Sequence, residues 1–441
     1  MRPRRRALAS INSELRDGIA PAAEGLSLVP VAPAPAPAAQ RNYRLIALII
    51  ACALFMEGMD ATVLATALPT MARDFQVPAP SVSSALTAYL LALAIFIPAS
   101  GRMADRFGAK TIFRLAILVF LAGSLLCAQA VSLPMLIAAR FVQGAGGAMM
   151  TPIGRLVLLR SVAKEDMVNA MSWLIMPALV GPIIGPPVGG FIVTYLNWRW
   201  IFYLNLPVGV IGVVLVTAFI GQIRSERPPP LDLLGFGLSG VSLGCLLFGF
   251  QMTSHPGALQ AALALIAVGL IAGALYVRHA RGHAAPILDL SLMQVPTFRL
   301  SVIAGSLTRI TQGAQPFLLP LMLQLGFGMS AAASGLITIA GAIGSLAMKW
   351  LAPRILRAFG FRRSLIVNGL IGAGGYAVCG FFRPFWPTPL IFAVLVLCGF
   401  FMSFQFTAYN TIAYDEIPPE RMSAATRAGR DLTESGFSNR R

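Results

Sequence analysis

The feature that most constrains this chain is a series of about twelve long apolar runs separated by short polar segments. A helix needs roughly twenty apolar residues to cross the hydrocarbon core of a bilayer. Because lipid offers the backbone no hydrogen-bond partner, only helices and closed barrels span it. We therefore predict an all-α polytopic membrane protein. Its predicted spans are residues 44–66, 83–101, 112–130, 134–158, 168–196, 200–221, 233–253, 258–277, 300–325, 332–352, 364–382 and 389–413.

The formal net charge of +17 raises the question of nucleic-acid binding. The basic residues, however, stand in short clusters between the apolar runs, and only 12% of all residues are charged. Positively charged loops are retained in the cytosol, so we predict a cytosolic N-terminus and no nucleic-acid partner. The outer loops keep little more than Arg73, Arg199 and Arg383. The clusters predicted to be cytosolic contain Arg102, Arg106, Lys110, Arg114, Arg160, Lys164, Arg224, Arg227, Arg278, Arg281, Arg299, Arg354, Arg357, Arg362 and Arg363.

Two acidic residues, Glu57 and Asp60, lie within the first apolar run, three positions apart and therefore on one face of a helix. Two carboxylates repel each other in a low-dielectric environment, so we expect at least one of them to bind and release a proton near neutral pH. The alternative is a structural carboxylate that pairs with a neighbouring helix. Acids inside a membrane usually serve function, which favours proton or substrate binding, for Asp60 more than for Glu57.

A buried cation is predicted in the run 134–158, where Arg140 precedes Gly144 and Gly147. An arginine inside a membrane helix must face the protein interior, and the glycines allow a neighbouring backbone to approach. We expect Arg140 to meet a carboxylate from another helix and to release it when that carboxylate is protonated. A purely structural ion pair is the alternative.

The run 168–196 contains ten consecutive residues, 181–190, with four glycines and three prolines. Proline bends a membrane helix by freeing a carbonyl, and glycine permits close packing. This combination predicts a hinge against the opposite half of the protein, although a kinked helix without a special role has the same sequence signature. The predicted hinge residues are Gly181, Pro182, Gly185, Pro186, Gly189 and Gly190.

Polar side chains in the last apolar runs predict a wet cavity. One of them, Arg309, is expected either to bind an anionic substrate or to neutralise Asp60 across this cavity, and a structural role is the alternative. The amides of the last run are equally suited to hold helices together. The residues predicted to line the cavity are Arg309, Gln312, Gln315, Gln324, Gln405 and Asn410, with Tyr409 beside them.

The segment 101–110 is a short charged loop between two apolar runs. Its glycines allow two helices to turn back closely on each other, and we expect Asp105 to pair with the cations of its own loop. Residues 105–108 (Asp-Arg-Phe-Gly) resemble residues 357–360 (Arg-Ala-Phe-Gly), a weak internal repeat of the kind found when two related bundles rock about a central site. The residues singled out in this segment are Gly101, Arg102, Asp105, Arg106, Gly108 and Lys110.

No catalytic set or cofactor site is predicted. The chain has no glycine-rich phosphate loop with Lys and Ser or Thr, so energy is expected from an ion gradient rather than from a nucleotide, and the protein is not expected to be an enzyme. The five cysteines lie in apolar runs without paired spacing and indicate neither disulfides nor a metal site. His279 and His283 stand one helical turn apart, but without a third ligand nearby we predict no metal there.

Taken together, these features resemble the drug:proton antiporter branch of the major facilitator superfamily that has fourteen membrane helices. The resemblance runs from about residue 44 to about residue 426, with Ser172 and Ala65 as departures from the usual pattern. Segment 101–110 matches the signature G-x-x-x-D-R-x-G-x-[RK]. The other matching motifs are Gly185-Pro186-x-x-Gly189-Gly190 preceded by Gly181, Asp60-x-Thr62 with Ala67-Leu68-Pro69, residues 197–202 with Asn205 and Pro207, Asp232, and residues 318–324.

The resemblance implies a major facilitator fold of two helical bundles with two extra central helices. Residues 415–426 resemble the loop that leads into a further helix, after which the sequence stays polar, so the last two helices are predicted to be missing. The predicted organisation is a disordered cytosolic tail (1–43), an N-terminal six-helix bundle (44–221), two linker helices with their connectors (222–298), a partial C-terminal bundle (299–413) and a polar cytosolic tail (414–441).

The resemblance also implies export of a small hydrophobic or amphipathic compound in exchange for protons, with Asp60 and Arg140 as coupling residues, segment 101–110 as the latch of a gate, and alternating access. The alternative is a transport-inactive truncated remnant that acts as a membrane binding or partner protein. Only three of the 34 basic residues are lysine, which favours a GC-rich bacterial genome and hence the inner membrane. Expected partners are the lipid bilayer, protons and the substrate, and a periplasmic adaptor protein is a further candidate.

Overall fold

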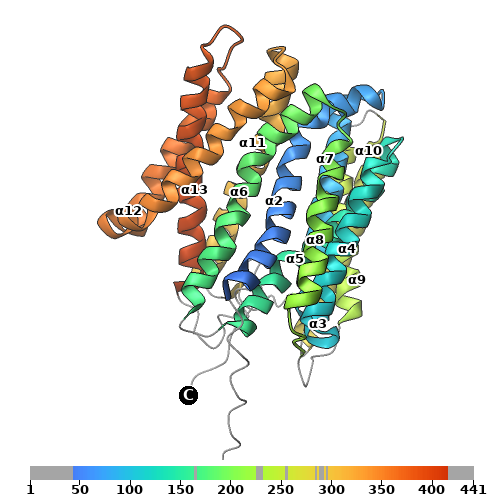
Figure 1. Cartoon of the computed structure of the whole chain (residues 1–441). Coiled ribbons are helices and arrows are strands. Elements are labelled where there is room, and N and C mark those ends of the chain that lie inside the picture. Colours follow the sequence, from blue (N-terminus) through green and yellow to red (C-terminus); the bar gives the residue numbers. More distant parts are fainter. Residues whose placement is uncertain are drawn as a thin grey trace, which may run out of the picture. The chain divides into compact units, whose positions relative to one another are not determined.

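The computed structural model describes residues 43–162, 166–224, 232–253, 257–283, 286–287, 293–294 and 296–415, and all regular elements within them are helices (Figure 1). Nine helices in this part of the chain are long and apolar enough to cross a membrane. Both predicted tails, 1–43 and 414–441, lie almost entirely outside the described residues. The helices are α2 (Tyr43–Asp74), α3 (Ser83–Phe107), α4 (Ala109–Ala128), α5 (Leu133–Ser161), α6 (Met167–Tyr195), α7 (Trp200–Tyr203), α8 (Asn205–Phe219), α9 (Leu233–Met252), α10 (Leu259–Gly282), α11 (Pro296–Leu321), α12 (Ala331–Cys379) and α13 (Thr388–Asp415).

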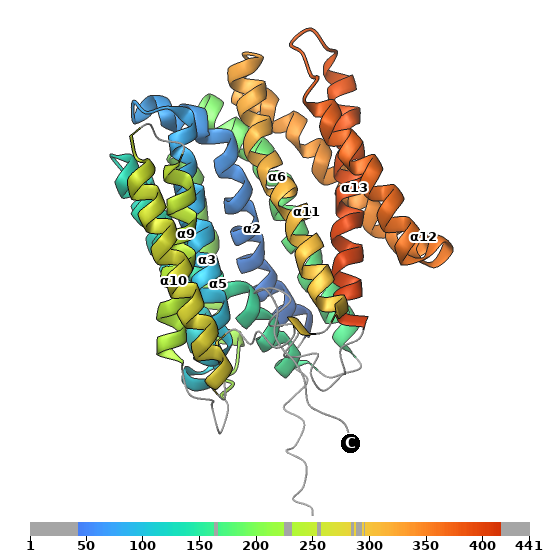
Figure 2. The same cartoon turned by 180° about the vertical axis from the view of Figure 1, so that it is seen from behind.

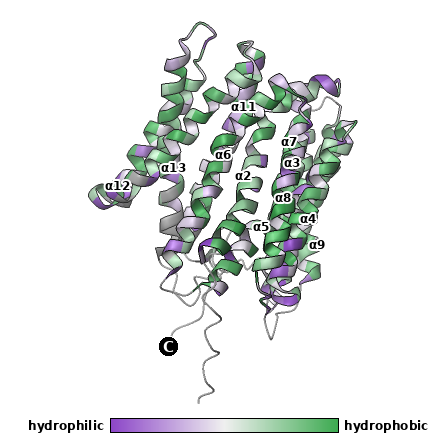
Figure 3. Ribbon diagram, in the orientation of Figure 1, coloured by the Kyte–Doolittle hydropathy of each residue, from purple (hydrophilic) through white to green (hydrophobic). Residues whose placement is uncertain are grey.

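Most predicted spans correspond to one helix each, and Figure 3 shows that their ribbons are largely hydrophobic. One local expectation was wrong. Residues 101–107 continue helix α3, so the connection to α4 is Gly108 alone and not a loop of ten residues. The helix continues there because polar residues at a membrane surface do not by themselves end it. The predicted spans 332–352 and 364–382 are two helical segments as expected, which share the label α12 and are separated by a kink at Gly360, where the backbone is not helical.

The weak sequence repeat has a backbone counterpart. Gly108 and Gly360, which end the two similar tetrapeptides, both have positive φ angles, 93° and 70°. This left-handed region favours glycine because a side chain there would crowd the following carbonyl. The two positions therefore reverse or bend the chain in the same way, once after α3 and once within α12.

Helices α2 to α8 pack around two apolar clusters. Small residues let the helices approach closely, as is common in membranes. A Cβ atom at Gly123 of α4 would lie 2.5 Å from the backbone N of Gln143 in α5, which shows how tightly these two helices pack. The first cluster includes Ile49, Ile50, Phe113, Phe120, Met150 and Val157, and the second includes Leu64, Leu68, Met71, Leu136 and Phe202.

Helices α9 and α10 form an antiparallel pair beside α3, visible from behind in Figure 2. The hydroxyl of Ser242 on α9 donates to the carbonyl of Gly269 on α10 over 2.8 Å. The amide of Gln251 donates to the hydroxyl of Ser84 at the start of α3. These contacts attach the pair to the helices that precede it in sequence.

The remaining helices, α11 to α13, pack on one another, and α12 contacts α6 while α11 contacts α2. Gly344 and Gly399 bring α12 and α13 into backbone contact. Gly190 of α6 faces the carbonyl of Ala331, and Gly335 of α12 faces the carbonyl of Pro186. The Ala332 N–H also donates to the hydroxyl of Thr194 over 3.0 Å. Helix α6 therefore lies between α2 on one side and α12 on the other.

Candidate functional site

A buried ion pair joins α2 to α5. Arg140 Nη1 lies 2.6 Å from Asp60 Oδ2, and neither side chain has any exposed surface. The pairing follows from the cost of an isolated charge in lipid, because each group on its own would be left uncompensated. The partner that sequence analysis required for Arg140 is thus Asp60.

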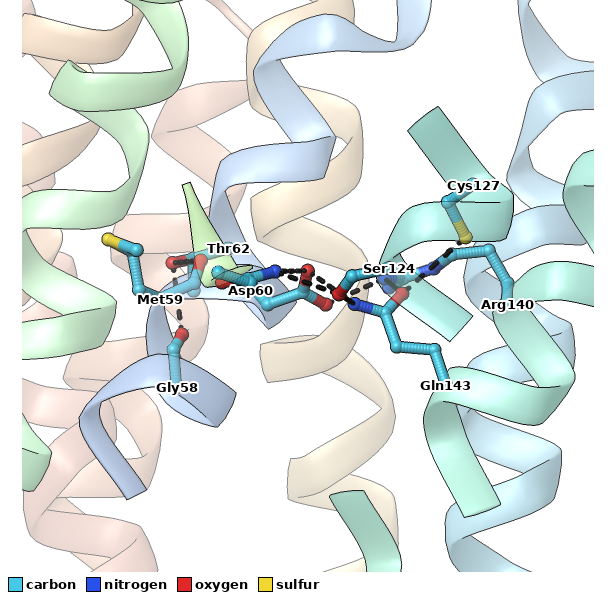
Figure 4. Close-up of polar contacts among 9 residues, drawn as sticks. Gly58, Met59, Asp60, Thr62, Ser124, Cys127, Arg140 and Gln143 are labelled. Carbon is cyan, nitrogen blue, oxygen red and sulfur yellow. Dashed lines mark hydrogen bonds and ion pairs between the residues drawn. The ribbon is translucent and has the colours of Figure 1, made fainter. Parts of the chain in front are cut away.

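Two further side chains, Gln143 and Asn205, form hydrogen bonds with this pair, and Ser124 contacts both of their amides (Figure 4). The amide of Gln143 donates to Asp60 Oδ1 over 2.9 Å, and its carbonyl accepts from Arg140 over 2.6 Å. The amide of Asn205 donates to the same Asp60 oxygen over 2.9 Å. Both amides also contact the hydroxyl of Ser124, at 2.7 and 3.2 Å. The site therefore collects side chains from α2, α4, α5 and α8.

The guanidinium of Arg140 is held mainly by aromatic rings on its other side. Its central carbon lies 4.4 Å from the ring centroid of Tyr89 and 5.9 Å from that of Phe202. Its Nε and Nη2 atoms are buried and have no hydrogen-bond partner among the described residues, and the same holds for the Tyr89 hydroxyl. The Arg140 guanidinium is thus paired with one carboxylate and faces two aromatic rings, while two of its nitrogen atoms donate no hydrogen bond to the described residues.

Glu57 lies one turn before Asp60 but outside this network. Its Oε2 accepts a hydrogen bond of 2.7 Å from the hydroxyl of Thr151 on α5. The two acids that share one helix face in the sequence therefore have different partners, and the ion pair with Arg140 is formed by Asp60.

A cavity of about 380 Å³ lies between α2 and α6 on one side and α11, α12 and α13 on the other. Asp60 is not among the residues that line it. Thr62 and Thr66 of α2 do line it, as does Pro186 of α6. Helix α2 therefore carries the ion pair on one face and part of the cavity wall on another, and the Thr62 hydroxyl is bonded to its own helix (Figure 4).

The six residues predicted to line the cavity are placed differently from one another. Gln315 lines it and accepts a hydrogen bond of 2.8 Å from Tyr376. Gln324 instead donates to the Thr66 carbonyl over 3.1 Å, and Gln405 is buried and donates to the Leu365 carbonyl over 3.0 Å, so both join helices. The other three, Arg309 and Gln312 in α11 and Asn410 in α13, have side chains that lie outside the described part of the chain.

The charged segment 101–110 contacts other elements rather than itself. We expected Asp105 to pair with the cations of its own segment, but it accepts from Arg160 at the end of α5 over 2.9 Å. Arg102 donates to the Pro286 carbonyl over 2.5 Å, and Lys110 donates to the Thr217 carbonyl over 2.7 Å. Because residues 102–106 are helical, their side chains point outward to neighbouring helices. These contacts place segment 101–110, Arg160 and Pro286 on one side of the protein.

Arg106 and Gly108 lie at the connection between α3 and α4. The Arg106 guanidinium lies 6.0 Å from the ring centroid of Phe107. The Ala109 N–H donates to the Ile223 carbonyl over 2.8 Å. A Cβ atom at Gly108 would overlap the side chain of Gln222, so space as well as the positive φ angle requires glycine there.

The glycines of the predicted hinge pack against α2 within one continuous helix, α6, that contains four prolines. A Cβ atom at Gly181 would lie 2.5 Å from the Phe55 carbonyl, and one at Gly189 would lie 2.5 Å from the Thr66 hydroxyl. Gly185 faces Thr62 equally closely, and the ring of Pro182 packs on Gly58. The stretch 181–190 thus forms the interface through which α6 contacts both α2 and α12.

Comparison with known proteins identifies the family. Residues 50–429 match the sequence profile of the Major Facilitator Superfamily. The chain belongs to this superfamily. It is a multi-pass membrane transporter with the all-α major facilitator fold.

Bacterial relatives are similar over most of this chain. A putative multidrug resistance protein MdtD of Pectobacterium carotovorum is 38% identical over 84% of this chain and 79% of its own. A probable transport protein HsrA of Haemophilus influenzae is 38% identical over 86% of this chain and 82% of its own. The relatives therefore include proteins named for drug resistance and for transport.

Solved superfamily structures share the fold. A D-xylose–proton symporter aligns with a TM-score of 0.63 at 14% identity, over 88% of this chain and 86% of that one. A bacterial homolog of the lysosomal transporter Spinster aligns with a TM-score of 0.60 at 15% identity, over 89% and 79% of the two chains. At such low identity these structures support the fold alone.

Several residues of this site were not predicted from the sequence. Asn205 belongs to a motif quoted above for the family resemblance, and Gln143 lies between Arg140 and Gly144. Ser124 and Tyr89 carried no signal. Lys349, which lines the cavity, is the only lysine within an apolar run, and that isolation was a usable signal. The thiols of Cys379 and Cys398, which have no paired spacing, lie 3.8 Å apart between α12 and α13.

One expectation about ligands was wrong. His279 and His283 do have a third potential ligand nearby, Asp232. Asp232 precedes α9, whereas the histidines lie at the end of α10. His279 Nε2 is 2.7 Å from Asp232 Oδ1. The antiparallel turn of the pair brings residues together that are 47 positions apart.

Proposed function

We propose that this transporter exports small hydrophobic or amphipathic compounds in exchange for protons, by alternating access across the bacterial inner membrane. Its N-terminus is cytosolic in this proposal. The observation that carries it is the fully buried Asp60–Arg140 pair beside a cavity between the two groups of helices. The multidrug-resistance names of the relatives support the same direction of transport.

The ion pair suits proton coupling because its two states differ in charge balance. With Asp60 ionised, Arg140 is neutralised at 2.6 Å. Protonation of Asp60 removes that attraction and leaves a cation with two unbonded buried donors. A charge in that condition is costly in a low-dielectric interior, so the protonated state favours a rearrangement that gives Arg140 new partners. In this proposal, proton uptake by Asp60 causes a change in the packing of the helices.

Helix α2 transmits this change to the substrate site. Its Asp60 face contacts α5 and α8, whereas Thr62 and Thr66 line the cavity. The glycines of α6 hold that helix in close contact with α2 and α12. A shift of α2 on protonation therefore moves the cavity wall, and no direct contact between the proton site and the substrate is needed.

The cavity fits a small amphipathic molecule. Its volume of about 380 Å³ falls within the range of small-molecule sites, roughly 300–1,000 Å³. Its walls combine apolar residues such as Pro182 and Leu319 with the hydroxyls of Thr338 and Tyr376. Among the described residues that line it, Lys349 is the one that is charged.

The test uses inverted membrane vesicles with a quenched acid-sensing dye that reports luminal pH. Lipophilic cations and then lipophilic anions are added to vesicles with the native chain, with Asp60→Asn and with Asp60→Glu. We expect at least one compound to release luminal protons with the native chain and, more weakly, with Asp60→Glu, which keeps a titratable carboxyl group. Asp60→Asn is expected to release none.

Glu57→Gln serves as the matched control, because it removes a carboxylate from the same helix without breaking the ion pair. Immunoblots of the vesicles verify equal insertion of all chains. Proton release by Asp60→Asn equal to that of the native chain would overturn the role of Asp60. Behaviour of the inserted native chain like that of empty vesicles with every compound would count against antiport itself.

A further inference from the structure

The α9–α10 pair ends in a cluster of three side chains that lies apart from the transport site. Asp232 caps the N-terminus of α9, His279 lies in the last turn of α10, and His283 directly follows that helix. One ligand atom from each of the three lies within 4.8 Å of the others. The two imidazole rings have centroids 5.0 Å apart. We propose that Asp232, His279 and His283 form a binding site for a divalent first-row metal ion of the Zn²⁺ type.

The donor set supports this class of ion. His279 in the last turn of α10 and His283 at its C-cap are four positions apart, and their rings lie side by side; the same i, i+4 spacing is used by helical His pairs that bind zinc. Two nitrogens and one carboxylate oxygen, with a fourth position left for water, form a common coordination set for Zn²⁺. Hard cations such as Ca²⁺ prefer six or more oxygen ligands, which these residues do not supply.

The carboxylate is held in place by its own partners. Asp232 Oδ1 accepts from the Gly235 N–H over 2.8 Å, and Oδ2 accepts from the Ile287 N–H over 3.3 Å. Burial opposes ionisation of Asp232, but these two bonds and the His279 ring outweigh it and lower its pKa below the ordinary value. Outer contacts of this kind orient the ligands of metal sites.

Binding requires only a small local change. Asp232 Oδ1 and His279 Nε2 are now 2.7 Å apart, a hydrogen-bond distance. Two ligands of one tetrahedral zinc ion, each at about 2.1 Å, lie about 3.4 Å apart. The ion therefore takes the place of the shared proton, and the distance between the two atoms increases by less than about 1 Å. The His283 ligand atom, now within 4.8 Å of the other two, must reach the same separation from them.

The site is connected to the charged segment of α3. Pro286, which accepts from Arg102, immediately precedes Ile287, which donates to Asp232. An ion that binds Asp232 and both histidines therefore fixes the end of the α9–α10 pair. It also fixes residues 286–287, which accept a hydrogen bond from Arg102 and donate one to Asp232. We expect the bound ion to raise the thermal stability of the chain, because it binds the folded state alone.

The experiment measures metal binding by the purified full-length chain in detergent, prepared with an affinity tag that contains no histidine. Titration calorimetry with Zn²⁺ gives the stoichiometry, and Co²⁺ absorption reports tetrahedral coordination. We expect one Zn²⁺ per native chain and a higher unfolding temperature with Zn²⁺. His279→Ala and His283→Ala are each expected to weaken binding about 10- to 100-fold or more.

His255→Ala is the matched control, since it removes the third histidine of the chain and leaves the cluster intact. Unfolding temperatures without metal verify that each variant is folded, and His283→Gln replaces His283→Ala should the latter prove unstable. The proposal is overturned by a native chain that binds no stoichiometric Zn²⁺. It is equally overturned by binding that His255→Ala weakens as much as His283→Ala, which indicates adventitious sites only.

Discussion

Asp60 and Arg140 lie 80 positions apart in the chain and form an ion pair of 2.6 Å with no exposed side-chain surface. Gln143 bridges the two, because its amide donates to Asp60 and its carbonyl accepts from Arg140. A fully enclosed pair of this kind is sensitive to the loss of either partner, and the two losses are not equivalent. The difference between them is measurable.

Removal of the acid is expected to destabilise the chain more than removal of the base. Asp60→Asn leaves Arg140 as an uncompensated buried cation, which costs about 3–5 kcal/mol. Arg140→Gln is milder, since Asp60 can bind a proton and become neutral, which arginine cannot do by losing one. The double variant is expected to be more stable than Asp60→Asn alone. Thermal unfolding of the four chains in detergent gives the coupling free energy, and additive effects would contradict this account.

Close packing of α6 on α2 predicts a position-specific effect of alanine. In Gly181→Ala the new Cβ atom would lie 2.5 Å from the Phe55 carbonyl, so a backbone must move, at a cost of about 1–3 kcal/mol. Gly237→Ala on α9 is the matched control, since nothing lies within 4 Å of that position. It is expected to be neutral or to stabilise the chain by up to about 1 kcal/mol. Equal unfolding temperatures for the two variants would show that the α2–α6 contact is looser than described.

The bend of α12 predicts a purely conformational cost. A Cβ atom at Gly360 meets nothing within 4 Å, yet φ is 70° there. Gly360→Ala is therefore expected to destabilise the chain by about 1–2 kcal/mol without any steric contact. Gly374→Ala, in the same helix and equally open, lacks the positive φ and is expected to have no such effect. Thermal unfolding compares the two, and an unaffected Gly360→Ala would mean that the helix runs straight through this position.

The cavity predicts a preference that depends on the charge of the substrate. Lys349 is the one charged residue in the part of the cavity lining that the structure describes, so Lys349→Gln is expected to weaken transport of lipophilic anions and to preserve or strengthen that of lipophilic cations. A change of about tenfold corresponds to about 1.4 kcal/mol, a modest electrostatic contribution. Lys349→Arg, which keeps the charge, is the control. The vesicle assay described above measures both, and an equal loss for anions and cations would assign Lys349 a structural role.

Features of the fold that depend on local sequence were predictable, whereas those that depend on contacts between distant segments were not. Hydropathy predicted the positions of the helices because it is a local property of each residue, and because bilayer thickness sets the length of each apolar run. The same reasoning identified Asp60 and Arg140, since a charge inside an apolar run is expensive wherever the helix packs. It failed for segment 101–107, because side-chain polarity at a membrane surface does not end a helix.

The sequence by itself therefore determined which segments form long apolar helices and which charges require partners. Only the tertiary structure decided what those partners are: Asp60 rather than Glu57 for Arg140, Arg160 rather than a neighbouring cation for Asp105, and Asp232 for His279. It also decided that Asp60 and Thr62 serve different faces of α2. The physical reason is that partner choice depends on how each helix is rotated and how closely it packs, and these quantities are set by several helices together.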